Sequence, residues 1–411
     1  MTNTAAPIEV RSCTQDDWPL ILTVDEAAFG YSFDPEQSQP DYALLEFDRS
    51  LLAWCEGVPV GHTTAYSLQM SVPGGQVPVA GVTWVAVLPT HRRRGVLTEL
   101  MRRQTRDIHE RGEPVAALYA SEPAIYPRFG FGLASQRLEV SIDCAYSAMH
   151  GPRDPALRTS LVTPEHARAA VEHVYAAIRT VRAGMPARPG LWWQRIVADP
   201  KARRDGASAL GAVVVADGAG PRAYALYCTK SAWEGGSPRG EIRVREHGSL
   251  DAAAAHELWR LLLNVDLVAT VSHQNMAVDD VLMQLLDDPR RARPALQDSL
   301  YVRLVDLPAA LAARSYATDY EGVVQVSDDL APWNAGRWRL SLHADGAGCD
   351  RTDAEPDLVV DVRALGAAYL GSTSLSPLVA AGQIQERRPG SAAALGRAMR
   401  HEPLAHCTFI F

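Results

Sequence analysis

Several features that would direct this chain to a membrane or to an oxidising compartment are missing from its sequence. No apolar run is long enough to span a bilayer, and the opening residues, MTNTAAPIEVRSCTQDDW, contain neither the basic region nor the apolar core of a secretory signal. The six cysteines are scattered, with no C-x-x-C pair, which disfavours a zinc site or a disulfide framework. We therefore expect a cytoplasmic protein with reduced thiols, no metal and no membrane partner.

An excess of positive charge is also missing. The formal net charge is -8, and a chain that binds nucleic acid through its phosphates normally presents a broad basic face. We expect no nucleic acid partner, and a cationic small substrate suits this charge better. With 47% hydrophobic and 21% charged residues, the 411 residues are ordinary globular material for two or three domains.

Two stretches that each contain two closely spaced prolines divide the chain. The first is MHGPRDPALRTS at 149–160 and the second is DDPRRARPALQDS at 287–299. They predict three segments, residues 1–150, 151–295 and 296–411.

The first segment alternates helices and strands. A strand at 8–12 precedes a helix with Thr14 as its N-cap and Gly30 as its C-cap. Three antiparallel strands are expected within 51–88, then a helix from Gly95 to Gly112, and then a buried strand at 114–121.

Three adjacent arginines, Arg92 to Arg94, stand before Gly95 where the third of these strands meets its helix. A glycine turn that opens a helix directs unpaired backbone N–H groups and the positive end of the helix dipole at one point. Taken alone, such a run is more often a solvated basic helix start. Because a strand ending at Pro89 precedes it, the pattern favours a binding site for a pyrophosphate.

The segments VAVLPTHRRRGVL (85–97) and SEPAIYPRFGFG (121–132) resemble the Eis acetyltransferases of actinobacteria, a branch of the GNAT N-acyltransferases. The resemblance continues through HELWRLLLNVDLVATV (256–271), LYVRLVDLPAALAARSY (300–316) and LVVDVRALGAAYLG (358–371). It implies α/β domains with mixed sheets: a GNAT fold, a central GNAT-like domain and a C-terminal domain like sterol carrier protein. The central segment has no Arg-Gly turn of its own, so we expect it to bind no second acetyl-CoA.

The resemblance also implies the residues that bind acetyl-CoA as co-substrate. The backbone of Val85, Ala86 and Val87 would bind the pantetheine arm and the thioester carbonyl. The remaining residues expected at the co-substrate are Arg92, Arg93, Arg94, Gly95, Val96, Leu97, Thr98, Ser121 and Glu122. Leu97 stands where the general GNAT pattern has a small residue.

Two groups are expected to move protons. The resemblance identifies Tyr126 as the donor of a proton to the departing thiolate, and a tyrosine, with a reference pKa of about 10, carries that proton at neutral pH. Tyr119 is the nearest competitor, and its position inside an apolar strand favours a packing role. A tyrosine beside Pro127 and Phe129 would, without the family, also be interpreted as packing.

The chain ends on Phe409, Ile410 and Phe411, an unusually apolar terminus. In the family, the α-carboxylate of the last residue acts as general base toward the substrate amine; a last strand of the C-terminal domain would also bury these residues. Direct proton transfer from an ammonium of pKa about 9 to a carboxylate of pKa about 3.5 would cost roughly 7.5 kcal/mol. Burial of the carboxylate, a partly neutral amine or a relaying water would each lower that barrier.

Three functions are compatible with these residues. The first is acetylation of aminoglycoside amines at one or more positions, with Asp25 and Glu26 pairing with the substrate. The second is acetylation of protein lysines or polyamines, and the third is a non-catalytic acyl-CoA or lipid-binding protein. Relatives assemble as hexamers, so by analogy we expect a homo-oligomer.

Overall fold

The computed structural model describes residues 7–411, and for residues 35–38 it describes the backbone alone. The chain forms two compact units. The first comprises the residues up to Ser135 together with Leu300–Glu402 and Ile410–Phe411. The second comprises Gln136–Ser299 and Pro403–Phe409.

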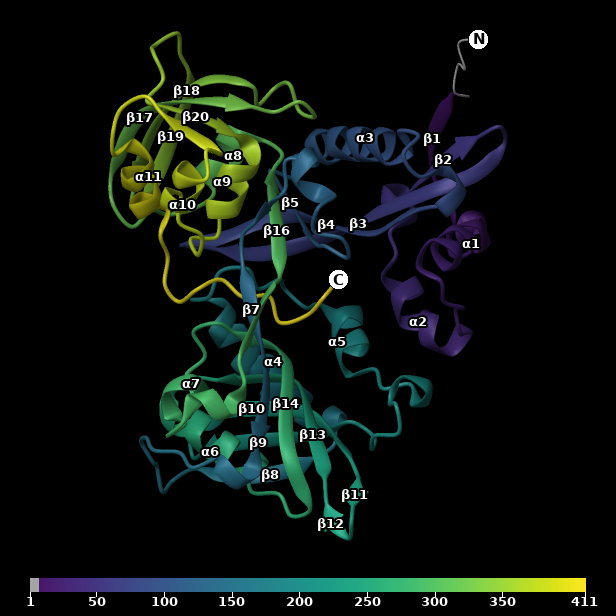
Figure 1. Cartoon of the computed structure of the whole chain (residues 1–411), viewed down its shortest axis with the longest axis vertical. Coiled ribbons are helices and arrows are strands. Elements are labelled where there is room, and N and C mark those ends of the chain that lie inside the picture. The colour runs from purple at the N-terminus through teal and green to yellow at the C-terminus, as the bar shows by residue number, and fades with distance from the viewer. Residues whose placement is uncertain (1–6) are drawn as a thin grey trace. The chain divides into compact units, whose positions relative to one another are not determined.

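The first unit contains a seven-stranded mixed sheet (Figure 1). Its strands lie in the order β1 (Ile8–Ser12), β2 (Leu51–Cys55), β3 (Val58–Val72), β4 (Gly75–Val87), β5 (Val115–Tyr119), β16 (Leu300–Leu304) and β6 (Gly132–Leu133). Strands β4 and β5 run parallel and are joined by helix α3 (Val96–Glu110). They form the strand–helix–strand unit that the turn at Gly95 predicts.

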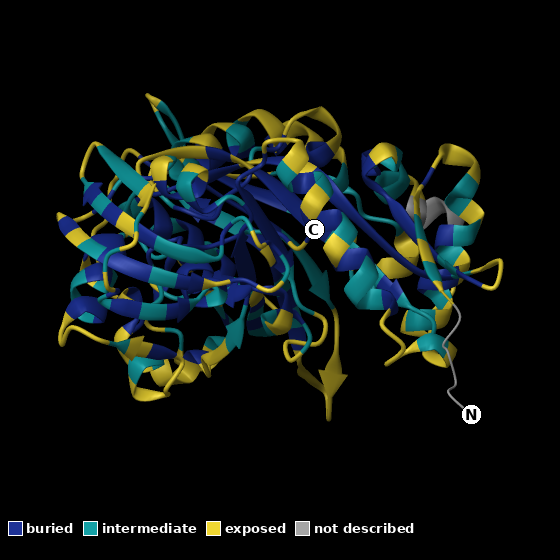
Figure 2. Cartoon of the chain, turned by 90° about the horizontal axis from the view of Figure 1, so that it is seen from above, coloured by how far each residue is buried: buried dark blue, intermediate teal, exposed yellow. Residues whose placement is uncertain are grey.

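Helices cover both faces of this sheet. The start of α3 packs onto β3, where a Cβ on Gly61 would collide with the Val96 side chain. Helix α1 (Trp18–Phe29) packs against Ala86 of β4 through Ile21 and Val24. Because Val87 belongs to the core beneath α3, and neighbouring strand residues face opposite ways, the two helices lie on opposite faces. Figure 2 shows the result: buried strands beneath helices that alternate buried and exposed residues.

The second unit repeats this strand order. Its seven-stranded sheet consists of β15 (Ala295–Asp298), β7 (Gln136–Asp143), β14 (Val268–Ala277), β13 (Gly240–Ser249), β10 (Gly220–Lys230), β9 (Gly211–Asp217) and β8 (Arg158–Val162). Its helices include α4 (Pro164–Arg179), α5 (Gly190–Val197), α6 (Ala252–Leu262) and α7 (Leu282–Leu285).

The two sheets use strands from distant parts of the sequence. Strand β16, from the expected third segment, lies between β5 and β6 of the first sheet, and β7, from the expected first segment, lies between β14 and β15 of the second. Strands β16 and β7 therefore occupy equivalent positions, each next to the edge strand of its own sheet. The division at 1–150, 151–295 and 296–411 stays a prediction about domains. At β7 and β16, the sheet that the strand joins is not the one that its position in the chain would suggest.

The rest of the first unit is built on a five-stranded sheet, which Figure 1 shows with short helices packed against it. The strands lie in the order β19 (Gly346–Arg351), β18 (Gly336–His343), β17 (Tyr320–Ser327), β20 (Leu358–Asp361) and β21 (Ile384–Glu386). The helices are α8 (Leu307–Ala312), α9 (Val362–Ala368), α10 (Ser376–Ala380) and α11 (Ser391–Met399).

Most elements expected in the first segment are present, with one correction at its start. Thr14 caps a short 3-10 turn, Gln15–Asp17, and α1 begins only at Trp18. The backbone N–H of Thr14 donates to the Asp17 carboxylate at 2.8 Å, which closes the turn before α1 begins. Gly30 ends α1 at φ +73°, as expected. Helix α2 (Pro35–Leu44), which contains Pro40, is an element that the sequence analysis does not predict.

Candidate active site

A cavity of about 610 Å³ lies where β4 ends and α3 begins. Its lining includes Tyr126 and every residue expected at acetyl-CoA except Arg94. The structure therefore brings together residues that are up to 41 positions apart, from Val85 to Tyr126. It does not bring Phe411, Asp25 or Glu26 into the lining of this cavity.

The cavity opens where two parallel strands diverge. The pairing of β4 with β5 runs from Val79 to Gly81 and ends there, although β4 continues to Val87. Trp84 has φ +53° at an irregularity in the β3–β4 pairing. The Nδ1–H of His62 donates to the Trp84 carbonyl at 3.1 Å, and burial lowers the pKa of His62 to about 4, so the ring is neutral. A neutral histidine therefore supports the irregular backbone beside the cavity.

The turn before α3 leaves the helix N-terminus open. Gly95 precedes the helix at φ +88° and Arg93 has φ +63°, and no side chain caps the helix. Three backbone N–H groups of the first turn therefore have no intrahelical acceptor. The guanidinium of Arg92 donates to the Ala28 carbonyl at 3.3 Å. The arrangement suits an anion held by backbone N–H groups with Arg92 and Arg93 beside it.

Tyr126 begins a 3-10 turn, Tyr126–Phe129, and is 4% exposed. Burial and the negative charge of Glu122 raise the pKa of Tyr126 to about 12, against a hydrogen bond with Ser121. The hydroxyl is therefore protonated throughout the physiological pH range. It can act as a proton donor and cannot act as a resting base.

The turn that carries Tyr126 is held by a buried ion pair. The guanidinium of Arg303, in β16, donates to the Phe129 carbonyl and to both carboxylate oxygens of Asp328, at 2.7 and 2.8 Å. Both side chains of the pair are 1% exposed. Gly130 follows the turn at φ +80°, and a Cβ there would collide with the Arg303 guanidinium. Sequence reasoning missed Arg303, because its partners lie 174 and 25 positions away.

Phe411 packs near the point where β4 and β5 diverge. Its ring meets the Tyr119 ring edge to face, with centroids 5.6 Å apart, and it is 6% exposed. A Cβ on Gly81 would lie 3.1 Å from a carbon of the Phe411 ring. Tyr119 thus has the packing role that its strand position favours.

Of the two acidic residues expected at the substrate, Glu26 borders a second cavity. That second cavity, of about 750 Å³, is also lined by Asp16 and by the aromatic rings of Trp18, Phe33 and Tyr42. The Glu26 carboxylate accepts the Phe33 N–H at 2.7 Å.

The aromatic rings form one group. Trp18 lies 5.1 Å from Tyr42 and 5.7 Å from Trp84, and Phe33 stacks on Trp84 at 5.5 Å. Aromatic faces beside carboxylates suit an ammonium group. Sequence reasoning missed these rings, because they come from two helices, a loop and a strand, and single aromatic residues are normally interpreted as core.

Asp25 is buried, and its carboxylate accepts a hydrogen bond from the Tyr31 hydroxyl. Burial raises its pKa to about 6, with a further contribution from the charge of Glu26 and against the Tyr31 hydrogen bond. A role of Asp25 at the substrate stays a prediction.

Among residues 7–34 and 39–411, no group of three or more histidine, cysteine, aspartate or glutamate side chains is arranged to hold a metal ion. Over the same described range, every helix is too short or too polar to cross a membrane.

Comparisons with known proteins match most of the chain. Residues 9–134 and 184–304 match two families, each described as an acetyltransferase (GNAT) domain, and residues 307–408 match the sterol carrier protein domain. An uncharacterized N-acetyltransferase of Streptomyces avermitilis is 43% identical over 388 residues, which cover 93% of this chain and 94% of its own.

Two mycobacterial proteins are also similar. The N-acetyltransferase Eis of Mycobacterium tuberculosis is 33% identical over 396 residues, which cover 92% of this chain and 94% of its own. The crystal structure of Eis1 from Mycobacterium abscessus superimposes with a TM-score of 0.82 at 32% identity, covering 98% of this chain and 100% of that chain.

Proposed function

Because this chain belongs to the Eis family of GNAT N-acetyltransferases, we propose that it transfers the acetyl group of acetyl-CoA to primary amines of aminoglycosides, at one or more positions. The observation that carries the proposal is the 610 Å³ cavity in which an uncapped helix N-terminus and Tyr126 occur together. A binding module would need the first of these features and would have no use for the second.

The chemistry of the turn fits the co-substrate. The open N-terminus of α3, with Arg92 and Arg93 beside it, would hold the pyrophosphate, and Val85 to Val87 would offer backbone groups to the pantetheine arm. Ser121 and Glu122 line the side of the cavity near Tyr126. When bound, acetyl-CoA supplies an activated thioester.

The acceptor is a cation before reaction, and the second cavity favours one. Glu26 and Asp16 supply negative charge, and the rings of Trp18, Phe33 and Tyr42 supply the faces to which ammonium groups are attracted. An aminoglycoside carries several amines, so it can contact the carboxylates with one ammonium group while another amine reacts.

Two groups of the chain would move the protons. The amine nitrogen forms a bond to the acetyl carbonyl carbon, and the carbon–sulfur bond breaks. The ammonium group loses two protons in all. The α-carboxylate of Phe411 takes the first, which frees the amine to attack. The Tyr126 hydroxyl gives its proton to the departing sulfur, and the second amine proton replaces it on the Tyr126 oxygen. Phe411 is 6% exposed and its ring packs on Tyr119, so the end of the chain that carries this carboxylate is packed against the protein.

Other expectations from the family belong to the same proposal. We expect a homo-oligomer, a hexamer by analogy, acting in the cytoplasm, with a central GNAT-like domain that binds no acetyl-CoA. The C-terminal domain would supply the carboxylate, whether or not it also binds a lipid.

A thiol-release assay with acetyl-CoA tests the proposal. The panel contains several aminoglycosides, lysine peptides and polyamines, and it is run with the native chain and with Tyr126→Ala. We expect release with aminoglycosides that falls sharply in the variant. Thiol release only with lysine peptides or polyamines would show that the chain acetylates protein lysines or polyamines. Binding of acetyl-CoA without thiol release for any acceptor would favour a non-catalytic protein.

A further inference from the structure

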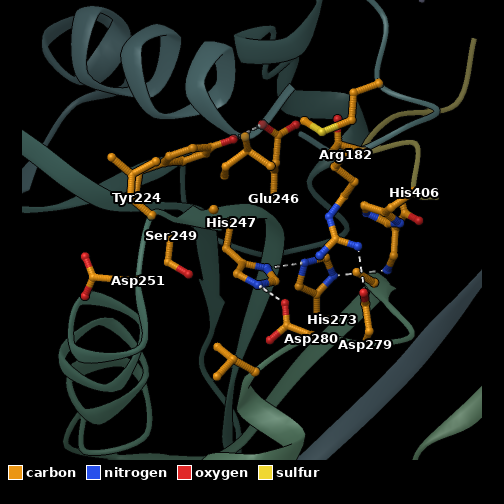
Figure 3. A pocket seen from close by; sticks show the side chains of 18 of the residues that line it. Arg182, Tyr224, Glu246, His247, Ser249, Asp251, His273, Asp279, Asp280 and His406 are labelled. Carbon is orange, nitrogen blue, oxygen red and sulfur yellow. Dashed lines mark hydrogen bonds and ion pairs between the residues drawn. The ribbon is translucent and has the colours of Figure 1, made fainter. Parts of the chain in front are cut away.

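The second unit contains a cleft with the same topology as the co-substrate cleft of the first. Strand β13 leads into α6 and then into β14, and the parallel pairing of the two strands ends at Val244 and His273, although both continue. A cavity of about 250 Å³ lies beyond this point, and Figure 3 shows the side chains around it. It corresponds to the place where β4 and β5 diverge.

The cleft between β13 and β14 is unsuited to a pyrophosphate. The N-terminus of α6 is capped by Asp251, whose carboxylate accepts the N–H groups of Ala253 and Ala254 at 3.0 and 2.9 Å. A negative charge therefore occupies the point at which α3 has only Gly95. The helix end repels the anion that the corresponding end of α3 attracts.

Histidines and an aspartate fill the middle of the cleft. His247 bonds to Asp280 at 2.8 Å through Nε2 and to His273 at 3.0 Å through Nδ1. Burial acts to raise the pKa of Asp280, but the interaction with His247 outweighs it and the pKa is about 2. These contacts leave a rigid, polar wall along one side.

The cleft is lined by part of the chain's own C-terminal segment, through His406 and Thr408. The Leu404 N–H donates to Asp279 at 2.8 Å, and Arg182 donates to the Leu404 carbonyl at 2.6 Å. Two further backbone contacts follow, from the His406 N–H to the Ala183 carbonyl at 3.0 Å and from the Asn275 side chain to the Cys407 carbonyl at 3.0 Å.

Arg188 holds the last part of this segment. Its guanidinium donates to both carboxylate oxygens of Glu246, at 2.8 and 2.7 Å, and to the Thr408 hydroxyl at 2.5 Å. It also lies 4.8 Å from the Phe409 ring centroid and 3.8 Å from that of Tyr175. The side chains of Arg188 and Glu246 are 0% and 4% exposed. A buried, bidentate pair of this kind has a fixed geometry, so the Thr408 hydroxyl and the Phe409 ring are fixed with it.

Fixing Phe409 confines Phe411. Two residues span at most about 7 Å of extended chain, so the α-carboxylate can move only within a short radius of Phe409. We propose that the cofactor cleft of the central unit has become a clamp for the C-terminal segment, in which Arg188 is a positioning residue for the Phe411 carboxylate. The inference rests on the proposed role of that carboxylate.

Thr408→Val removes the hydroxyl that Arg188 and Tyr175 contact, while the Arg188–Glu246 pair stays intact. Thr408→Ser keeps the hydroxyl, and Thr159→Val removes a comparable hydroxyl, bonded to Glu257 at 3.1 Å, that does not contact the segment. Two quantities are measured: the rate at which a carboxypeptidase releases Phe411 from the folded chain, and kcat and KM for acetyl-CoA.

We expect Thr408→Val to release Phe411 about tenfold faster, because a hydrogen bond from a charged donor is lost. Its kcat should fall by a similar factor at unchanged KM for acetyl-CoA, while both control variants behave as the native chain.

Unchanged release in Thr408→Val would overturn the clamp. Faster release of Phe411 at native kcat would overturn the positioning role of Arg188. The kcat of a chain ending at Ile410 then shows separately whether the catalytic role of Phe411 fails as well.

Discussion

The ring of Phe411, the last residue, meets the ring of Tyr119, the last residue of β5, at a centroid distance of 5.6 Å and an interplanar angle of 82°. The end of the chain is thereby packed beside the point where β4 and β5 diverge. A terminus buried in this way has lost the freedom that chain ends normally keep, which is the condition for using its carboxylate at a fixed place.

Tyr126→Phe removes one hydroxyl and keeps the buried ring. If Tyr126 donates the proton to sulfur, kcat should fall by about 10²–10⁴, with KM for acetyl-CoA nearly unchanged. Because the pKa of Tyr126 is raised to about 12, the native enzyme should lose no activity through this group as the pH rises to 10. Steady-state rates of the native enzyme and of Tyr126→Phe across pH 6–10 measure kcat, KM and their dependence on pH. A kcat of Tyr126→Phe within twofold of native would remove Tyr126 from the mechanism.

The arginines of the turn should differ in their effect on the co-substrate. Arg93 lines the co-substrate cavity and Arg94 does not, although both are exposed. Arg93→Ala should raise the Kd of acetyl-CoA about tenfold, and more at low salt, whereas Arg94→Ala should change it little. Calorimetric titration at two salt concentrations decides, and equal effects of the two substitutions would contradict the placement of the pyrophosphate.

Asp25 should make stability depend on pH. Its pKa is about 6 in the folded chain against a reference of about 3.9, so its stabilising contribution is complete below pH 4 and is lost as the pH rises through 6. Asp25→Asn should therefore increase the free energy of unfolding at pH 8, by up to about 3 kcal/mol, and change it little near pH 4. Urea unfolding at both pH values tests this, with the exposed Asp16→Asn as control.

A gain for Asp25→Asn that is the same at both pH values would show that the carboxyl titrates normally in the folded chain. A higher KM for the amine at unchanged stability would instead support the predicted substrate role of Asp25.

Arg303→Met leaves Asp328 buried and without its cation, which should cost about 3–5 kcal/mol of unfolding free energy. Adding Asp328→Asn should restore part of that stability, because no charge is then buried and the amide oxygen can still accept the Leu330 and Ala331 N–H groups. Activity should stay low in the double variant, since the Phe129 carbonyl still lacks the guanidinium that holds the Tyr126 turn. Recovery of activity together with stability would show that the ion pair serves stability alone.

How far the sequence predicts this molecule depends on the range of the interactions. Gly95 and the arginines before it are adjacent in sequence, so the strand, the turn and α3 follow from local pattern, and family resemblance adds Tyr126. The end of α1 at Gly30 is equally local, because a residue in the left-handed region is needed there.

Features that depend on distant pairing could not be predicted in this way. Strands β7 and β16 have ordinary strand patterns, and nothing in either shows which sheet it joins. Arg188 is one of many arginines in the sequence, and its contacts with Glu246 and Thr408 join positions 58 and 220 residues away.

The α-carboxylate of Phe411 is the group on which the proposed reaction depends most directly, and one measurement isolates its contribution. The native chain and a chain ending at Ile410 are each mixed with acetyl-CoA and an aminoglycoside under single-turnover conditions, and acetylation is followed over time. Loss of a positioned base predicts a rate at least about 100-fold lower for the shortened chain, with an unchanged Kd for acetyl-CoA. Equal rates for the two chains would contradict a catalytic role of this carboxylate.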